Sequence, residues 1–299
     1  MDRRYVTADV FTTEIFRGNP LAVVLDAEGL STEDMQAITV EFNYSETTFV
    51  LPSRDEAHTA RVRIFNPSRE MPFAGHPNIG TAYVLAREYQ RRGERVPDRF
   101  VFEEAAGLVR IELLREGGAV VGAELTAPEK LSRGAAVPPD EAAPLFGLTA
   151  RDIVTTTHMP TVASVGMPFL IMEIATRDAL RRARPDAAVY ETVLPGAGAF
   201  SVYGYTSDVD AGTDGDTDVQ ARMFTSRMTE DPATGSATGA MIALRAASLG
   251  VADLQLRVGQ GTDMGRPSLL LASATGKRED LVSRVGGRCV AVMDGLISM

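Results

Sequence analysis

Glu70-Met71-Pro72-Phe73-Ala74-Gly75-His76 and Glu230-Asp231-Pro232-Ala233-Thr234-Gly235-Ser236 are two versions of one pattern, 160 residues apart in a chain of 299 residues. Each copy follows a strand-like segment that ends Arg-apolar-Phe, namely Arg63-Ile64-Phe65 and Arg222-Met223-Phe224. Each copy also precedes a helix-like segment rich in small residues. A repeat spaced by about half the chain predicts a duplicated structural unit.

The segments around the first copy predict mixed strands and helices. Alternating or β-branched runs at Tyr5–Val10 and Ala60–Phe65 are typical of strands. The segment Pro77–Arg92 is apolar around most of a helical circumference, which predicts a helix wrapped by sheet. We therefore expect an α+β fold of two pseudo-symmetric half-barrel domains. Each would be a curved, mostly antiparallel sheet around a central helix, and the two loops would face each other across a cleft.

Proline and glycine mark the boundary between the halves, in a connector at 128–147. We expect the first half to span 1–127, with the C-terminal strand 286–299 as an optional addition, and the second half to span 128–285. The Gly/Asp-rich segment Asp208–Asp218 lacks the spacing of a calcium loop, so we expect a solvated excursion there.

The charge balance excludes several classes of partner. Thirty basic residues against 40 acidic ones give a net charge of −10, which argues against nucleic acid and anionic membrane surfaces. The N-terminus lacks the apolar segment of a secretory signal, and no apolar stretch is long enough to span a bilayer. We expect a cytoplasmic protein. The single cysteine, Cys289, forms no intrachain disulfide and is expected in a buried strand.

Gly75 and Gly235 stand just before the expected helix starts. Helix N-termini offer unpaired N–H groups and partial positive charge, and glycine allows close approach, so two such loops suit a small carboxylate. The alternative is a pair of tight strand-to-helix turns. His76, beside one glycine, is the best histidine for acid–base chemistry, with a structural hydrogen bond as its alternative role. His58 is expected to be exposed and idle, and three dispersed histidines do not suggest a metal site.

Glu46, in Asn43-Tyr44-Ser45-Glu46-Thr47, lies between a helix end and an apolar strand. A partly buried carboxylate there would have a raised pKa and could act as base and acid. The position alone fits an ordinary exposed turn glutamate better.

Three segments together resemble the signatures of the phenazine-biosynthesis PhzF-like family: the Glu46 segment, Met71–Pro77 and Asp231–Ala237. Gly18-Asn19-Pro20 and Gly265-Arg266-Pro267-Ser268 also fit, so the resemblance runs over nearly the whole chain. It implies the diaminopimelate-epimerase fold and an isomerase that needs no cofactor. The family's namesake activity is isomerisation of trans-2,3-dihydro-3-hydroxyanthranilate, and a homodimer is expected from the resemblance alone.

The resemblance also implies roles for particular residues. Glu46 corresponds to the family's acid–base residue, and His76 and Asp231 to residues that handle protons and polar groups of the substrate. Gly75, Gly235 and Ser236 correspond to elements that hold the substrate carboxylate. No dinucleotide or phosphate-loop glycine pattern is present in the proper context, and no metal is expected.

Related epimerases and racemases use two cysteines, whose equivalents here are Ala74 and Thr234. Two-thiol racemisation is therefore ruled out, and proton transfer by one carboxylate favours double-bond isomerisation. A cofactor-free epimerase or lyase on the same scaffold, and a non-catalytic small-acid binding protein, stay as alternatives.

Overall fold

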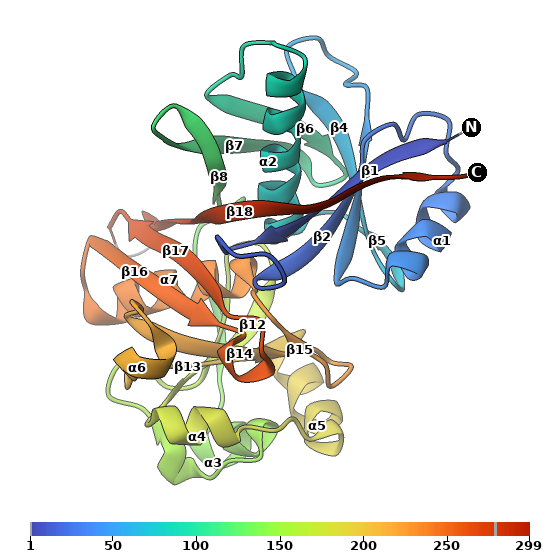
Figure 1. Ribbon diagram of the computed structural model, residues 1–299. Coiled ribbons are helices and arrows are strands. Elements are labelled where there is room, and N and C mark those ends of the chain that lie inside the picture. The colour runs from blue at the N-terminus through green and yellow to red at the C-terminus, as the bar shows by residue number, and fades with distance from the viewer. Residues whose placement is uncertain (1, 278–279) are drawn as a thin grey trace. The chain divides into compact units, whose positions relative to one another are not determined.

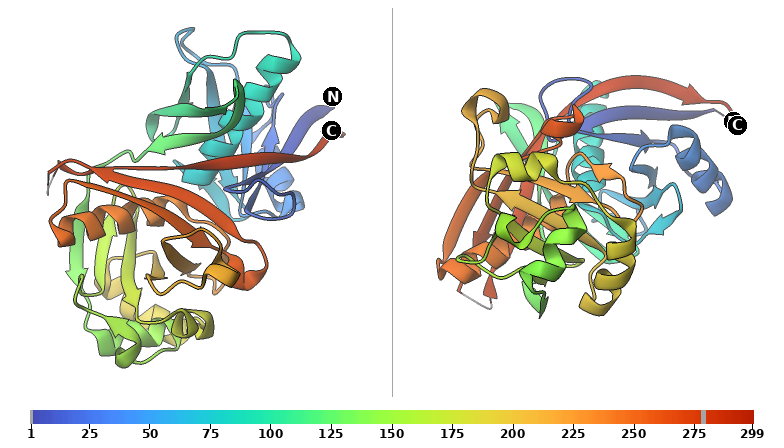
Figure 2. Two further views of the ribbon diagram at one scale, coloured as in Figure 1. Left: turned by 60° about the vertical axis from the view of Figure 1, so that its left-hand side comes forward. Right: turned by 90° about the horizontal axis from the view of Figure 1, so that it is seen from below.

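The computed structural model describes residues 2–277 and 280–299. The chain divides into two compact units: unit 1 is Met1–Leu125 with Gly286–Met299, and unit 2 is Thr126–Val285. Strand β18 (Val282–Ile297) begins in unit 2 and continues into unit 1, where it runs beside β1 (Figure 2).

Unit 1 consists of strands wrapped around one buried helix, α2, which runs through the middle of the unit in Figure 1. A second helix, α1, packs on β3 and β4 and covers a cluster that includes Met35, Phe49 and Phe65. The elements of unit 1 besides β18 are β1 (Arg3–Val10), β2 (Asn19–Val24), α1 (Thr32–Phe42), β3 (Glu46–Leu51), β4 (Ala60–Asn66), β5 (Arg69–Met71), α2 (Gly75–Arg91), β6 (Arg99–Glu104), β7 (Gly107–Glu116) and β8 (Ala119–Thr126).

Unit 2 has its own central helix, α7, packed on β11, β12, β16 and β17. Its elements are β9 (Ser132–Ala136), α3 (Pro139–Ala142), η1 (Ala143–Phe146), η2 (Ala150–Asp152), β10 (Ile153–Val154), β11 (Thr161–Ser164), β12 (Pro168–Ile174), α4 (Arg177–Arg182), α5 (Ala187–Ala197), β13 (Ser201–Thr206), α6 (Ala211–Asp214), β14 (Val219–Phe224), β15 (Glu230–Asp231), α7 (Gly235–Leu249), β16 (Asp253–Gln260), η3 (Thr262–Met264) and β17 (Ser268–Thr275).

The two units repeat one scheme of strand pairing. In unit 1, β1–β2 is antiparallel, β2–β3 parallel, β3–β4 and β4–β5 antiparallel, β4–β6 parallel and β6–β7 antiparallel. In unit 2 the same order of senses runs through β11–β12, β12–β13, β13–β14, β14–β15, β14–β16 and β16–β17. The predicted α+β architecture, with a mostly antiparallel sheet around a central helix in each half, is confirmed.

Several local predictions hold for clear reasons. Helix α1 begins after Ser31, whose side chain forms a capping box with Asp34, and ends at Asn43 in the left-handed conformation. Cys289 is buried in β18, and burial raises the pKa of its thiol to about 12. No described helix is long and apolar enough to cross a membrane.

The connector predicted at 128–147 contains the short elements β9, α3 and η1, and the short strand β5 precedes the His76 loop. One prediction was wrong because a tertiary contact supplies what local signals lack. The 208–218 segment is not merely solvated. It contains α6, and Asp214 is buried at 2.9 Å from the Arg177 guanidinium. A buried arginine requires an acidic partner, which accounts for this aspartate.

Gly80 lets α2 lie directly on β1 and β2. A Cβ at this position would be 2.5 Å from Leu21 Cδ2 and 2.8 Å from Val10 Cγ2, closer than packed atoms tolerate. The spacing between the central helix and the sheet in unit 1 therefore depends on this missing side chain.

We predict that Gly80→Ala destabilises the protein by about 1–3 kcal/mol, because overpacking outweighs the better helix propensity of alanine. Urea denaturation followed by circular dichroism measures this change. The matched control is Gly239→Ala in α7, where the nearest neighbour of the new Cβ lies at 3.3 Å and the effect should be small. Equal stability of wild type and Gly80→Ala would contradict the packing argument.

Candidate active site

Glu46 and His76 lie together in unit 1. Glu46 is the first residue of β3, and His76 is the second residue of α2. His76 Nδ1 lies 3.5 Å from Glu46 Oε2, and the two side chains are 6% and 19% exposed. Glu46 is therefore not the exposed turn residue that its position alone favoured.

The imidazole of His76 is held in a buried polar setting. Asn19 Nδ2 lies 3.4 Å from His76 Nδ1, while Nε2 is buried and has no hydrogen-bond partner within the described part of the chain. Burial lowers the pKa of His76 to about 3, and a hydrogen bond with the Pro20 backbone only partly opposes this effect. The ring is therefore neutral at neutral pH, so its contact with Glu46 joins an imidazole and a carboxyl group.

The helices that follow the two glycine loops begin without a side-chain cap from the residue before them. Neither Ala74, before α2, nor Thr234, before α7, makes a side-chain capping hydrogen bond, and neither helix has an acidic residue in its first turn. The Thr234 hydroxyl instead donates to Asp231 Oδ2 at 2.5 Å. A helix start with no acidic residue in its first turn favours an anion.

The Gln260 side chain binds the second glycine loop, Asp231–Ser236, through hydrogen bonds. Its Nε2 donates to Asp231 O at 2.8 Å and to Thr234 Oγ1 at 3.0 Å, and Thr234 N donates to Gln260 Oε1 at 3.1 Å. The side chain is fully buried. Sequence reasoning missed Gln260, because only the parallel pairing of β14 with β16 brings the end of β16 under this loop.

The repeated Arg-apolar-Phe and Glu elements form one clamp in each unit. Arg63 Nε and Nη2 donate to the two oxygens of Glu70 at 2.6 Å, and Arg222 makes the equivalent bonds to Glu230 at 2.8 Å. Each guanidinium also lies over the phenylalanine two residues on, Phe65 or Phe224. The clamps fix the strands β5 and β15 that lead into the glycine loops.

The other histidines have structural partners. His58 is not exposed and idle as predicted, since its Nδ1 lies 2.9 Å from Glu103 Oε1 and its side chain is 18% exposed. His158 Nε2 lies 2.9 Å from Tyr205 Oη in the interior of unit 2. No group of three potential metal ligands occurs in residues 2–277 and 280–299.

The sequence pattern of the phenazine biosynthesis-like protein family, PhzC–PhzF, matches residues 8–295. The chain belongs to this family. An uncharacterized isomerase of Mesorhizobium japonicum is 38% identical, with 98% of each chain covered. Trans-2,3-dihydro-3-hydroxyanthranilate isomerase of Pseudomonas chlororaphis is 32% identical, again with 98% of each chain covered. Membership in this family identifies the chain as an isomerase.

Solved structures agree with the fold. The PhzF-family phenazine biosynthesis protein of Bacillus anthracis superposes with a TM-score of 0.84 at 25% identity, covering 100% of both chains. A hydroxyproline epimerase of Agrobacterium vitis, 13% identical, shares the fold alone, with a TM-score of 0.62 over 100% of this chain and 93% of its own. The predicted diaminopimelate-epimerase-like class of this PhzF-family chain is thereby confirmed.

We predict that the His76 ring stays neutral down to about pH 4, because the folded protein keeps its pKa near 3. Below the ordinary pKa of 6.5 the unfolded chain binds a proton that the folded chain does not. Stability from this group is therefore complete above pH 6.5 and falls with decreasing pH, by at most about 1.4 kcal/mol per unit.

NMR titration of the histidine ring protons checks this value, and a His76→Gln variant identifies the resonance. A midpoint near pH 6 for that resonance would show that the imidazole is not desolvated as described.

Proposed function

We propose that this PhzF-family isomerase moves a double bond in a small carboxylate-bearing amino or hydroxy acid, with Glu46 as the acid–base residue and without a cofactor. The observation that carries the proposal is the shielded contact between Glu46 Oε2 and His76 Nδ1. A carboxylate held beside a neutral imidazole can accept a proton from carbon and return it.

The proposed reaction breaks one C–H bond and forms another. Glu46 takes the proton, the electron pair shifts along the conjugated system, and Glu46 returns the proton to a different carbon on the same face. His76 and Asp231 are proposed to assist this proton transfer and to bind polar groups of the substrate. Gly75, Gly235 and Ser236 are proposed to hold the carboxylate, where helix N–H groups stabilise the developing negative charge.

Two features support isomerisation over the alternatives. Inversion at carbon requires groups on both faces, and the one cysteine of the chain is buried in β18 with a raised thiol pKa. A simple binding protein has no need of a desolvated histidine whose Nε2 lacks a partner among residues 2–277 and 280–299, which favours an enzyme. The relatives named trans-2,3-dihydro-3-hydroxyanthranilate isomerase make that compound the first substrate to test.

We predict that Glu46→Gln lowers kcat by about 10²–10⁴-fold and leaves folding intact, because glutamine keeps the shape and loses the proton acceptor. Turnover of trans-2,3-dihydro-3-hydroxyanthranilate and of related cyclic acids, measured in D₂O, gives both rate and position of the new hydrogen. Glu41→Gln, on the exposed side of α1, is the matched control.

Full activity of Glu46→Gln would remove Glu46 from the mechanism. Deuterium at an inverted stereocentre of an otherwise unchanged product would establish the epimerase alternative, and elimination products would establish the lyase. We also propose a cytoplasmic homodimer, the oligomeric state being checked by light scattering after size exclusion.

A further inference from the structure

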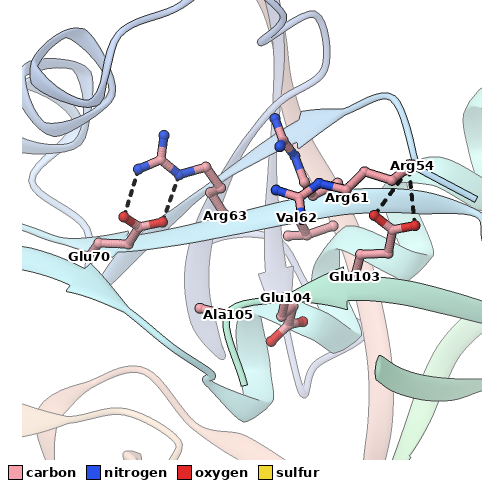
Figure 3. A pocket seen from close by; sticks show the side chains of 8 residues that line it. All are labelled: Arg54, Arg61, Val62, Arg63, Glu70, Glu103, Glu104 and Ala105. Atoms are coloured by element: carbon pink, nitrogen blue, oxygen red, sulfur yellow. Dashed lines mark hydrogen bonds and ion pairs between the residues drawn. The ribbon is translucent and has the colours of Figure 1, made fainter. Parts of the chain in front are cut away.

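A cavity of about 420 Å³ opens beside β4 in unit 1 (Figure 3). Strand β5 pairs with Ile64–Asn66, and β6 pairs with Ala60 and Arg61, so Val62 and Arg63 lie between the ends of these two neighbouring strands. The lining residues are Arg54, Arg61, Val62, Arg63, Glu70, Glu103, Glu104 and Ala105.

Two of the three arginines that line the cavity, Arg54 and Arg61, have no acidic partner at hydrogen-bond distance among the described residues. Arg63 is paired with Glu70, and the Glu103 carboxylate accepts from the backbone N–H groups of Arg54 and Asp55 and contacts His58. Within the described chain, the guanidinium groups of Arg54 and Arg61 have no acidic or hydrogen-bonded partner. Arg54 is exposed to solvent, whereas Arg61 Nε is buried. A buried donor without an acceptor is costly unless a ligand satisfies it.

The corresponding strand position in unit 2 carries a neutral side chain. Register pairs Arg61 with Glu103 in unit 1 and Gln220 with Gly259 in unit 2. The Gln220 side chain lies over Gly259, where a Cβ would be 2.0 Å from Gln220 Nε2, and it donates to Thr217 Oγ1 at 3.2 Å. The duplicated fold therefore does not require an arginine at this strand position.

We propose that this cavity is a binding site for the phosphate group of a small metabolite, held by Arg54 and Arg61. The planar N–H donors of two unpaired guanidinium groups suit the oxygens of a phosphate. The volume admits a small organic phosphate rather than a polymer.

The test is calorimetric titration of the full chain with inorganic phosphate and then small sugar phosphates, at constant ionic strength. We expect saturable binding that weakens at least tenfold in Arg61→Gln, which copies unit 2, and vanishes in the Arg54→Gln/Arg61→Gln double variant. Arg99→Gln, which removes a paired surface arginine, should change nothing. No saturable binding, or equal binding by the double variant, would overturn the proposal.

A second, independent observation concerns Glu104, the last residue of β6. The next residues pass under the His76 loop, where Ala106 N donates to Pro72 O at 3.1 Å. Figure 3 shows the Glu104 side chain directed away from the arginines. Both of its carboxyl oxygens are buried without a hydrogen-bond partner in the described residues, as is Oδ1 of Asn78 in the first turn of α2.

Glu104 is the counterpart of Gln260. The β4–β6 pairing places Phe102 beside Ala60, and the β14–β16 pairing places Val258 beside Val219, so Phe102 and Val258 are equivalent. Glu104 and Gln260 each follow two residues later and are therefore equivalent as well. Gln260 binds the second glycine loop through a neutral amide. Burial raises the pKa of Glu104 to about 8, against a smaller opposing effect of Asn78, so the carboxyl is protonated and neutral at pH 7.

We infer that the buried Glu104 carboxyl group positions the loop that carries His76 through the side chain of Asn78, in the first turn of α2. Asn78 in turn donates through Nδ2 to Ala74 O at 3.0 Å, next to Gly75. The charged or titratable groups on the surrounding elements are Arg61 and Arg63 of β4, Glu103 of β6 and His76 of α2. Desolvation, rather than any of their charges, keeps Glu104 protonated.

The test compares Glu104→Gln and Glu104→Leu with wild type in unfolding and in turnover across pH. Between the ordinary pKa of 4.5 and about 8 the folded chain holds a proton that the unfolded chain has released. The folded fraction therefore falls with rising pH, by up to tenfold in the unfolding constant per unit, and Glu104→Gln should lack this component. Wild-type kcat/KM should fall above pH 8, whereas Glu104→Gln should stay active there and Glu104→Leu should be impaired throughout.

Gln260→Glu should impose a similar pH-dependent loss of stability, and Glu112→Gln serves as the surface control. The turnover measurement rests on the proposed function, whereas the unfolding measurement does not. A failure of the proposed function can therefore be distinguished from a failure of the inference about Glu104. Identical pH dependence of unfolding in wild type and Glu104→Gln would overturn the inference, as would full activity of Glu104→Leu.

Discussion

The bidentate pair between an arginine on one strand and a glutamate on the next holds each glycine loop in place. In both units the glutamate lies directly opposite the phenylalanine of the Arg-apolar-Phe segment, in the pairs Phe65–Glu70 and Phe224–Glu230. Arginine and phenylalanine are two residues apart and therefore share a face of the strand. One guanidinium thus joins the strand, the aromatic ring and the loop, and the course of the chain toward Gly75 or Gly235 follows from it.

Duplication explains the scaffold, and the differences between the copies explain the chemistry. The same pairing scheme supports His76 in one loop, beside Glu46, and Asp231 with Thr234 in the other. Glu104 in unit 1 corresponds to Gln260 in unit 2, so an acid takes the place of an amide. Arg61 in unit 1 corresponds to Gln220 in unit 2, so an arginine takes the place of a glutamine. Each difference changes the side chain at a position where the strand pairing is the same in both units.

Periodicity and the repeat predict the architecture well, because strand alternation and the helix apolar around most of its circumference are local signals. They place the Glu46 and His76 segments correctly but say nothing of their 3.5 Å contact, which depends on the parallel pairing of β2 with β3. The sequence does not indicate the roles of Gln260 and Glu104 either, because these roles depend on the parallel pairings β14–β16 and β4–β6. The buried Asp214 is hidden in a polar segment, since only its partner Arg177, 37 residues earlier, shows why an acid should be interior.

Strand β18 has a consequence for how the protein is made. Residues Arg3–Val10 pair along one edge with β18, from Cys289 to Ile297, so β1 meets this neighbour only after all of unit 2 has been synthesised. The sheet of unit 1 stays incomplete until then, whereas unit 2 is one continuous segment that can fold first. The unit that contains Glu46 and His76 is therefore completed after unit 2, and disruption of Cys289–Ile297 would leave an edge of β1 unpaired.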